Sequence, residues 1–294
     1  NEERKMSIGN GTLEDFTLAI CYTQIPTQYS DILSIANTYT YKGEEAGYTV
    51  QTGATTGSPV TRTLQNKLDD FASVRDFGAV GDGITDDTDA INRALFQLFC
   101  RQTNTQIRRS LFFPAGTYRT TASINIPPFA KLYGEGSESS IIKLDASSGD
   151  VFVVRTADSE QNIGVNIGNN GANPPSNIHL QGMSFITDKV TDVCLIQDAA
   201  EIDIQDVAFR GPLQQSNLGD SADNISCIRF SSTSAITTRQ VTVDMCTLSG
   251  CTYGVNTNDA VEGSTISNCN FRTLYQGALI GQGTLLNGGP MGVR

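Results

Sequence analysis

The sequence has few basic side chains, a single histidine and no long apolar run, and each scarcity argues against a class of function. It contains 20 Lys and Arg against 31 Asp and Glu, and its formal net charge is −11 without a basic cluster. Because like charges repel, such a surface disfavours a nucleic-acid partner. No apolar run approaches the ~18–20 residues of a membrane-spanning helix, and residues 1–20 lack the form of a signal peptide. We therefore expect neither nucleic-acid binding nor membrane insertion.

Motifs for metal binding and nucleophilic catalysis are also lacking. The seven cysteines are odd in number, none stands in a Cys-x-x-Cys motif, and His179 is the one histidine. A zinc site or a disulfide framework is therefore not expected. Most cysteines should be small buried thiols, which fits assembly in a reducing cytoplasm. Without a nucleotide-binding glycine motif or a nucleophile triad, we expect neither a metal nor another cofactor.

What is present fits one large all-β domain with a smaller module before it. The 294 residues are 38% hydrophobic, which is enough for a packed core. Residues 1–60 are rich in Thr, Gly, Gln, Asn and Ser, with a strand-like piece at Phe16–Tyr22 and a possible helical turn at Asp31–Ala36. Thr52–Pro59 resembles a linker. Because this region has few apolar residues, we expect it to oligomerise or to dock on another protein.

The segment Thr61–Ala72 predicts a short amphipathic helix. Leu64, Leu68 and Phe71 follow one another at i, i+4 and i+7, on one helical face. In a monomer this stripe would lie on the next domain. In a trimer, three copies could meet at an axis as a neck. The residues alone leave both arrangements open.

The segment Ser73–Cys100 predicts a short strand, a glycine turn and a capped helix at Asp87–Cys100. Glycines in Gly81–Gly83 allow a tight turn, and a residue of Thr85–Asp87 can cap the helix. The aspartates here lack the ligand order of a calcium loop, so capping explains them better than a metal site. The helix should bury Ile91, Leu95, Leu98 and Phe99.

Beyond residue 110, short apolar segments recur between Gly and Ser turns, and four of them share an eight-residue pattern. Apolar residues fill the third, sixth and eighth places, and the first place in three of the four. These segments are Ile178–Phe185, Ile202–Phe209, Val241–Leu248 and Ser264–Phe271. A unit of about 20–25 residues that cannot bury its own apolar face forms a solenoid when stacked on similar units. Short strands without intervening helices predict a β-helix, with a bend where the apolar spacing changes from two to three.

Two details of the repeat concern its interior and its end. Cys246 and Cys269 occupy equivalent places, which predicts a ladder of packed thiols rather than a required disulfide. Gly283–Arg294 contains no cap, and an open β-helix end would expose unpaired strands. We therefore expect the chain to be a fragment, or the front part, of something longer.

Four motifs within Thr61–Asp145 carry a family resemblance. They are Arg62-Thr-Leu-Gln-Asn-Lys-Leu68, the stretch Val74–Ile91, Phe113-Pro-Ala-Gly-Thr-Tyr118 and Leu132-Tyr-Gly-Glu-Gly136. With them the chain resembles the tailspike and tail-fibre proteins of bacteriophages, within the pectate-lyase-like, right-handed parallel β-helix group. The lead-in that starts at Arg62 is typical of phage members in particular.

The resemblance implies an all-β fold, a right-handed single-stranded parallel β-helix with a short N-terminal capping α-helix. It divides the chain into a virion-anchoring region at 1–60, a neck helix at 61–72, the β-helix cap and first strands at 73–145, and β-helix rungs at 146–294. It further implies a homotrimer that is assembled in the host cytoplasm and located in the phage tail. Residues 1–70 would join a virion tail or baseplate protein, and the β-helix would meet a bacterial surface polysaccharide.

The resemblance also bounds the function. Many such relatives cleave the glycan with carboxylates as acid and base, and others only bind it. We expect host attachment, with a polysaccharide depolymerase (glycoside hydrolase or lyase) as the alternative; a secreted pectin-degrading enzyme fits less well without a signal peptide. Plant-type polygalacturonases have Asn-Thr-Asp, Asp-Asp and Gly-His-Gly motifs, whereas this chain has only Asn256-Thr-Asn-Asp259 and a His179 without flanking glycines. Catalytic residues therefore do not carry over from the family.

Glu201, Asp203 and Asp206 form the densest carboxylate group in a rung and are the candidate catalytic residues. In an alternating strand, Glu201, Asp203 and Gln205 should face outward together. Two carboxyls about 5–9 Å apart can act as acid and as nucleophile or base on a glycoside. A solvated outer strand face explains these carboxylates as well.

Other polar and aromatic side chains are secondary candidates. We expect His179 to be a surface histidine rather than a catalyst. Tyrosines can stack on sugar rings, although packing at turns and edges explains them equally well. The secondary candidates are Asp220, Asp223 and Asp244, together with Tyr118, Tyr133, Tyr253 and Tyr275.

Overall fold

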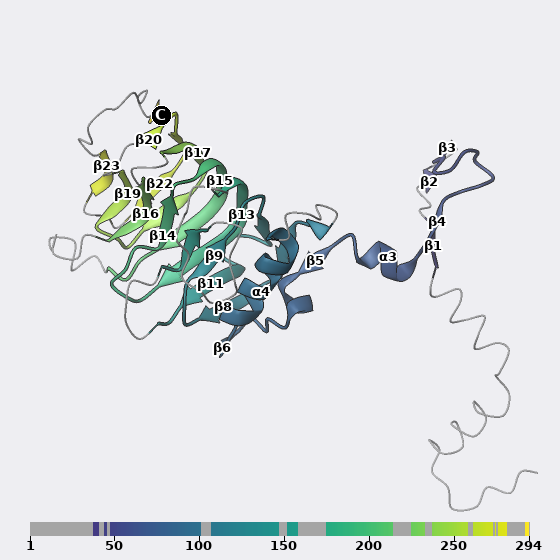
Figure 1. The fold of residues 1–294 in the computed structure, drawn as a ribbon, viewed down its shortest axis with the longest axis horizontal. Coiled ribbons are helices and arrows are strands. Elements are labelled where there is room, and N and C mark those ends of the chain that lie inside the picture. Colours follow the sequence, from purple (N-terminus) through teal and green to yellow (C-terminus); the bar gives the residue numbers. More distant parts are fainter. Residues whose placement is uncertain are drawn as a thin grey trace, which may run out of the picture. The chain divides into compact units, whose positions relative to one another are not determined.

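The computed structural model forms two compact units, Asn1–Asp70 and Phe71–Arg294 (Figure 1). It describes residues 38–40, 44–45, 48–100, 107–146, 152–157, 175–213, 225–232, 237–257, 261–272, 274, 276–280 and 292–293. The N-terminal pieces predicted at Phe16–Tyr22 and Asp31–Ala36 lie outside these residues. No helix in the described ranges is long and apolar enough to cross a membrane.

The described part of the first unit consists of short antiparallel strand pairs and one short helix. Strand β1 (Thr38–Thr40) pairs with β4 (Thr61–Thr63), and β2 (Glu44–Glu45) pairs with β3 (Tyr48–Thr49). Helix α3 (Leu64–Leu68) follows β4 directly, and the Thr63 side chain accepts a hydrogen bond from the backbone N–H of Asn66. The helix is shorter than the segment Thr61–Ala72 because the first three residues of that segment pair with β1.

Arg62 ties the end of α3 to the start of the segment. Its Nη1 lies 2.6 Å from Asp70 Oδ2 and its Nη2 lies 2.9 Å from Oδ1, the paired geometry that a guanidinium makes with a carboxylate. These hydrogen bonds from Arg62 lower the pKa of Asp70 to about 2. The arginine of the phage-like lead-in therefore has a local structural role.

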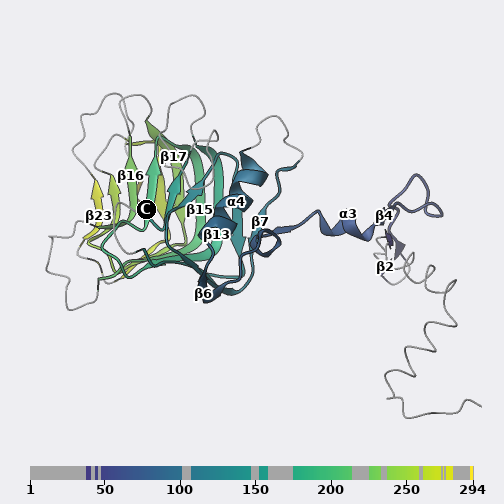
Figure 2. The same cartoon turned by 60° about the horizontal axis from the view of Figure 1, so that its bottom comes forward.

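The second unit is a stack of parallel strands (Figures 1 and 2). One long sheet runs, in spatial order, through β5 (Ala72–Ser73), β7 (Leu111–Phe113), β10 (Lys131–Gly134), β13 (Ser176–Thr187), β15 (Ala200–Arg210), β17 (Thr238–Asp244), β21 (Thr265–Ser267) and β24 (Gly292–Val293). We call the outward side of this sheet, over β7 to β17, the outer face.

Two further rows of strands complete the stack. A flank continuous with the long sheet contains β6 (Asp82–Asp86), β8 (Gly116–Thr120), β11 (Ser140–Leu144), the second halves of β13 and β15, β18 (Thr247–Ser249) and β22 (Asn270–Arg272), while β20 (Val261–Glu262) pairs with β17. A separate sheet contains β9 (Ile124–Ile126), β12 (Val154–Thr156), β14 (Cys194–Gln197), β16 (Ser226–Ser231), β19 (Tyr253–Thr257) and β23 (Gln276–Ile280). This arrangement confirms the predicted all-β, parallel β-helix class.

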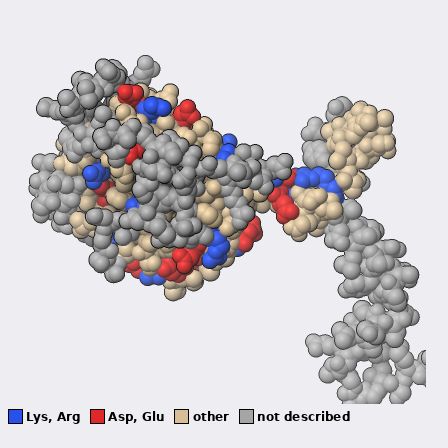
Figure 3. Space-filling model, in the orientation of Figure 1, with Lys and Arg blue, Asp and Glu red and all other residues tan. Residues whose placement is uncertain are grey.

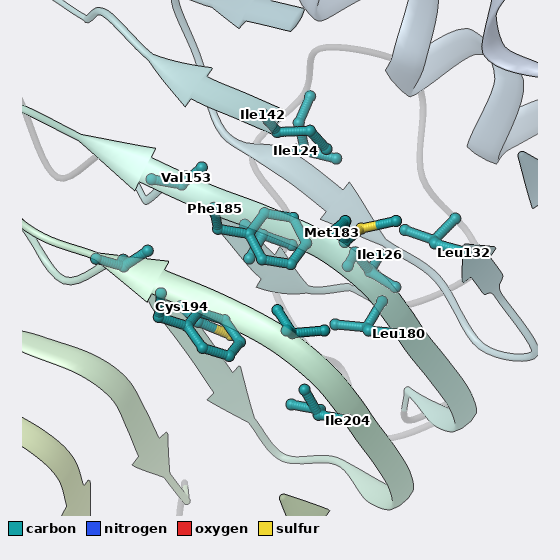
Figure 4. Close-up of a cluster of buried hydrophobic side chains, with 14 of the residues drawn as sticks. Ile124, Ile126, Leu132, Ile142, Val153, Leu180, Met183, Phe185, Cys194 and Ile204 are labelled. Atoms are coloured by element: carbon teal, nitrogen blue, oxygen red, sulfur yellow. The ribbon is translucent and has the colours of Figure 1, made fainter. Parts of the chain in front are cut away.

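The strand register stacks equivalent residues of successive coils in the interior. Ile202 lies beside Ile178, Ile204 beside Leu180 and Phe209 beside Phe185. The rings of Phe185 and Phe209 stack with their centroids 5.6 Å apart. Figure 4 shows Phe185 in the core among Ile126 and Cys194, which come from the separate sheet. The apolar places of the eight-residue pattern are therefore the inward places, since a residue there is covered by its counterparts above and below.

The predicted bend is present, and it is made by residues in the left-handed backbone region. Gly182, Asp206, Met245 and Asn268 occupy equivalent places and have φ of 64°, 51°, 52° and 51°. A second column of such bends opens the strand segment, at Phe129, Asn177, Glu201, Gln240 and Gly263, with φ between 54° and 66°. Since a left-handed residue turns the chain sharply, the strand segments between Asn177 and Gly182, between Glu201 and Asp206, and between Gln240 and Met245 are bounded on both sides.

Helix α4 (Thr88–Phe99) lies where the sequence predicts it, with Asp87 and Cys100 as its flanking residues. Its four predicted apolar residues are buried, and the helix contacts the 3₁₀ helix η1 (Val74–Phe77) and strand β9. The capping differs in detail. Asp86 accepts the hydrogen bond from the backbone N–H of Thr88, whereas the buried Asp87 accepts bonds from the N–H groups of Val80 and Gly81. A cap on the β-helix end and a right-handed coil stay predictions.

Two of the family-like motifs pack directly on each other at Gly81 and Tyr118. The Tyr118 ring is fully buried, and its hydroxyl donates to the Pro114 carbonyl at 2.9 Å. Gly81 has φ +72°, and a Cβ there would lie 2.8 Å from the Tyr118 ring. The Thr117 N–H donates to the Gly81 carbonyl at 2.9 Å. Gly81 is thus required both by its backbone conformation and by the close approach of the ring.

Substitution Gly81→Ala should destabilise the fold more than Gly263→Ala does. Both glycines have positive φ, which costs roughly 1–2 kcal/mol for alanine, but a Cβ at Gly263 meets nothing within 4 Å. The clash with Tyr118 should bring the total for Gly81→Ala to roughly 2–5 kcal/mol. Urea denaturation of the two variants measures this difference, and equal losses would contradict the packing described.

Candidate functional site

The structure places the three candidate carboxylates on one strand, β15. Ile202 and Ile204 point into the core, so Asp203 and its neighbour Gln205 lie on the outer face. Glu201 and Asp206 occupy the two left-handed bends on either side of this segment and are exposed. Asp203 is therefore half exposed in the middle of the outer face, with one carboxylate at each bend.

The structure brings His179 to Asp203. These two residues are partners in the register of β13 and β15, and His179 Nδ1 lies 3.5 Å from Asp203 Oδ2. Both side chains are 49% exposed, so His179 is a surface histidine, as expected. Each residue is in the second place of its eight-residue unit. The contact could therefore have been predicted by laying one unit on the next.

Two rows of side chains cross the outer face on neighbouring strands. The first row contains Lys131, His179, Asp203 and Thr242. The second contains Phe112, Tyr133, Gln181, Gln205 and Asp244. Since neighbouring strands are about 4.8 Å apart, each row is a continuous line of polar and aromatic groups across the coils.

An aromatic platform begins the second row. The rings of Phe112 and Tyr133 stack with centroids 4.9 Å apart and an interplanar angle of 28°, and both side chains are half-buried. Leu111 and Phe113 on either side of Phe112 are fully buried. The outward direction of Phe112 could have been predicted from the alternation of buried and exposed places in Leu111–Phe113.

Asp244 ends the second row as a firmly held carboxylate. Its Oδ1 accepts hydrogen bonds from Ser267 Oγ at 2.8 Å and from Asn268 Nδ2 at 2.9 Å, and these bonds lower the pKa of Asp244. Asp244 is therefore an ionised acceptor at neutral pH. The other two secondary carboxylate candidates, Asp220 and Asp223, lie outside the described residues.

The four candidate tyrosines have different surroundings. Tyr118 is in the core and is unavailable to a ligand. Tyr133 belongs to the aromatic platform, and Tyr253 is half-buried on β19, in the separate sheet. Tyr275 lies outside the described residues. Only Tyr133 among the described tyrosines is on the outer face.

On the flank, in contrast, the charged side chains form ion pairs with one another. Arg119 and Lys189 both contact Asp145, at 2.9 and 3.5 Å, and Lys143 lies 2.8 Å from Asp188. Arg210 pairs with Glu138. On the side of the molecule drawn in Figure 3, acidic and basic groups are interspersed rather than gathered by sign. Along the described strands, the outer face is thus the one that combines an aromatic platform with amides and carboxylates.

The outer face can hold a sugar chain and can move protons, but it holds no evident metal cage. No three His, Cys, Asp or Glu side chains in the described ranges converge as metal ligands. Aromatic rings pack on apolar faces, and amides and carboxylates exchange hydrogen bonds with hydroxyl groups. A half-exposed carboxylate beside an imidazole is a pair that can accept and return a proton.

Comparison with known proteins establishes the family. The model of the rhamnogalacturonase A/epimerase, pectate lyase-like family matches residues 71–279, and the chain belongs to this family. The pectate-lyase-like part of the resemblance is thereby confirmed. A glucan 1,3-beta-glucosidase from Cochliobolus carbonum is 40% identical over 65 residues, which are 22% of this chain and 8% of that protein.

Solved structures that the comparison matches to this chain include phage and bacterial proteins. The N-terminal fragment of gene product 12 of bacteriophage Phi29 is 17% identical, with a TM-score of 0.46, over 70% of this chain and 36% of that one. Tailspike protein 3 of bacteriophage CBA120 is 16% identical, with a TM-score of 0.46, over 90% and 40%. A putative glycosyl hydrolase from Parabacteroides merdae is 14% identical, with a TM-score of 0.49, over 76% and 97%. The chain thus spans well under half of the curated relative and of both phage chains.

Proposed function

We propose that this chain is part of a phage tailspike that attaches the virion to a bacterial surface polysaccharide. The observation that carries the proposal is the outer face, where the Phe112–Tyr133 platform continues into Gln181, Gln205 and Asp244. Sugar rings have apolar C–H faces and hydroxyl edges, so a platform followed by amides and a carboxylate matches them along one line. The lead-in at Arg62–Leu68 supports a phage origin.

The two units have distinct tasks in this function. Residues 1–70 join a virion tail or baseplate protein, and the stacked coils reach the glycan. The protein is assembled in the host cytoplasm and is located in the tail. A right-handed coil, with α4 covering the first rung, belongs to the same proposal, and the buried face of α4 supports it.

The subunit is a homotrimer in this proposal, with α3 as a neck. Leu64 is 38% exposed and Leu68 is 58% exposed, and α3 buries none of its residues within the described chain. Three such helices meeting at an axis would remove these leucines from water, which favours association by about 25 cal/mol per Å² of apolar surface.

Substitution Leu68→Asp should convert a trimer into monomers, because three carboxylates would be brought together at the axis. Light scattering coupled to size exclusion measures the molar mass. Val190→Asp is the matched control, since Val190 is a 62% exposed apolar residue of the second unit and its substitution should leave the mass unchanged. A parent protein that is already monomeric would contradict the proposed neck.

Substitution of the platform should weaken glycan binding. We expect Phe112→Ala and Tyr133→Ala each to reduce the affinity for host capsule or O-antigen at least about fivefold, since aromatic contacts contribute ~1 kcal/mol. Tyr253→Ala, on the separate sheet, should bind like the parent protein. Binding is measured by biolayer interferometry with the purified polysaccharide, after circular dichroism has shown that each variant is folded. Unchanged affinity in both platform variants would exclude the outer face as the binding site.

A depolymerase is the second candidate function, and the His179–Asp203 contact is the observation that favours it. Asp203 can serve as acid or base on the outer face, with Glu201 or Asp206 as the second carboxylate at a bend. Glu201, Asp203 and Asp206 are therefore the catalytic residues in this second proposal. The imidazole of His179 beside it is a second group of the kind that transfers protons in catalysis.

If the protein cleaves its glycan, Asp203→Asn should lower the rate by about 10²–10⁴-fold while binding persists. New reducing ends report hydrolysis, and new ultraviolet absorbance reports elimination, which leaves an unsaturated product. Asp188→Asn is the control, because Asp188 is paired with Lys143 on the flank. A parent protein that binds the polysaccharide without forming either product leaves attachment as the function.

A further inference from the structure

Two pairs of cysteines lie close together inside the stack, and all four thiols are free. Cys246 and Cys269 occupy the sixth place of consecutive units, between the paired positions Asp244 with Ser267 and Thr247 with Asn270. Cys227 and Cys251 form a second close pair elsewhere in the core. The predicted ladder of packed thiols at Cys246 and Cys269 is confirmed, and the second pair was not foreseen.

The geometry of Cys246 and Cys269 suits a covalent bond between them. Asn270 N–H donates to the Cys246 carbonyl at 2.7 Å, which holds the two backbones side by side. Each Sγ points the same way, since Cys246 Sγ lies 3.2 Å from the Asp244 carbonyl and Cys269 Sγ lies 3.1 Å from the Ser267 carbonyl. Neighbouring parallel strands are about 4.8 Å apart, within the ~4.4–6.8 Å between Cα atoms that a disulfide spans. The two thiols also lie close enough to shift each other's pKa.

The two members of this pair differ in a way that favours reaction with an oxidant. Cys269 is half-buried, and the hydrogen bond from the Cys246 thiol lowers the pKa of Cys269 to about 7. Cys246 is buried, and the same hydrogen bond raises its pKa. Of the two, Cys269 is therefore the one that more readily becomes a thiolate, and the thiolate is the form that attacks peroxides.

The Cys227–Cys251 pair lacks these properties. Both side chains are fully buried, with relative exposures of 0%, and burial raises the pKa of Cys227 well above its ordinary value. A thiol that is neutral and shielded from solvent is inert toward oxidants. Cys227 and Cys251 are therefore an internal control: two thiols that lie close together and should not react with an oxidant.

We propose that Cys246 and Cys269 form an oxidation site that closes a disulfide between two consecutive coils. The Cys269 thiolate attacks a hydroperoxide, forming an S–O bond and breaking the O–O bond, with the leaving oxygen taking up a proton. The Cys246 sulfur then forms the S–S bond and displaces the hydroxyl of the sulfenic acid as water. Overall, two thiols and one hydrogen peroxide give one disulfide and two waters, so the sulfurs are oxidised and the peroxide is reduced.

The bond would act on the cohesion of the stack, independently of any glycan. It joins the coil of β17 and β18 to the coil of β21 and β22, beside the bends at Met245 and Asn268. In a reducing cytoplasm the thiols stay free and the coils assemble. Outside the cell, the disulfide would prevent these coils from separating, because it removes unfolded conformations in which they are apart.

The test is controlled oxidation of the intact chain. Hydrogen peroxide at one equivalent per chain should remove two titratable thiols and two hydrogen masses. Digestion with trypsin and a glutamate-specific protease cuts after Arg239, Glu262 and Arg272, so the expected product joins peptides 240–262 and 263–272. The midpoint of thermal unfolding of the intact protein should rise after oxidation and return to the starting value with a reductant.

Three variants assign the bond. Cys246→Ser and Cys269→Ser should each abolish the joined peptides and the thermal shift, whereas Cys251→Ser should retain both. Joined peptides that persist in Cys246→Ser would overturn the proposal. A disulfide mapped to Cys227 and Cys251 in the parent protein, or oxidation of Cys269 that leaves Cys246 open to alkylation, would overturn it as well, and neither result depends on how well a variant folds.

Discussion

Parallel backbone pairing in a fixed register is the constraint on which the second unit depends. Each coil hydrogen-bonds to the next over several residues, as in the pairing of β13 with β15 from Ser176 with Ala200 to Ile186 with Arg210. The backbone groups of an inner coil are satisfied only if the neighbouring coil keeps this alignment. The alignment in turn places like residues on like residues, so Phe185 meets Phe209 in the core and His179 meets Asp203 on the outer face.

The same stacking gives the three rows of strands different chemistry. On the flank, the charged residues of neighbouring coils have opposite partners within reach, and Asp145 is shared between Arg119 and Lys189. On the outer face, aromatic and amide groups interrupt the charges, and the firmly held Asp244 keeps its charge at neutral pH. A surface whose charges are already paired has less to offer a ligand than one whose hydrogen-bonding groups face water.

Much of this arrangement could be predicted from the sequence because the apolar residues that recur at a fixed spacing are the residues that become buried. The inward places of the repeat, the bend at Asp206 and the helix from Thr88 all followed from apolar spacing and turn residues. The chemistry that depends on approach in space could not be predicted as well. Asp87 serves the turn at Gly81 rather than its own helix, and α3 is short because Thr61–Thr63 pairs with a strand far back in the chain. In the candidate site, the contact of His179 with Asp203 could be predicted by aligning the repeat units. The Phe112–Tyr133 platform could not, because it joins strands outside the repeat.

The two columns of left-handed bends have a consequence for how such a protein can change. In the coils that carry Asn177, Glu201, Gln240 and Gly263, the same number of residues separates the opening bend from the closing one. One residue gained or lost between the bends would turn every following side chain of that strand over, exchanging core for surface. In these coils the strand segment between the bends therefore has a constant length, which insertions cannot extend without disrupting the core. Sequence variation in these coils is therefore confined to the identity of the outward side chains and to the loops beyond the two bends.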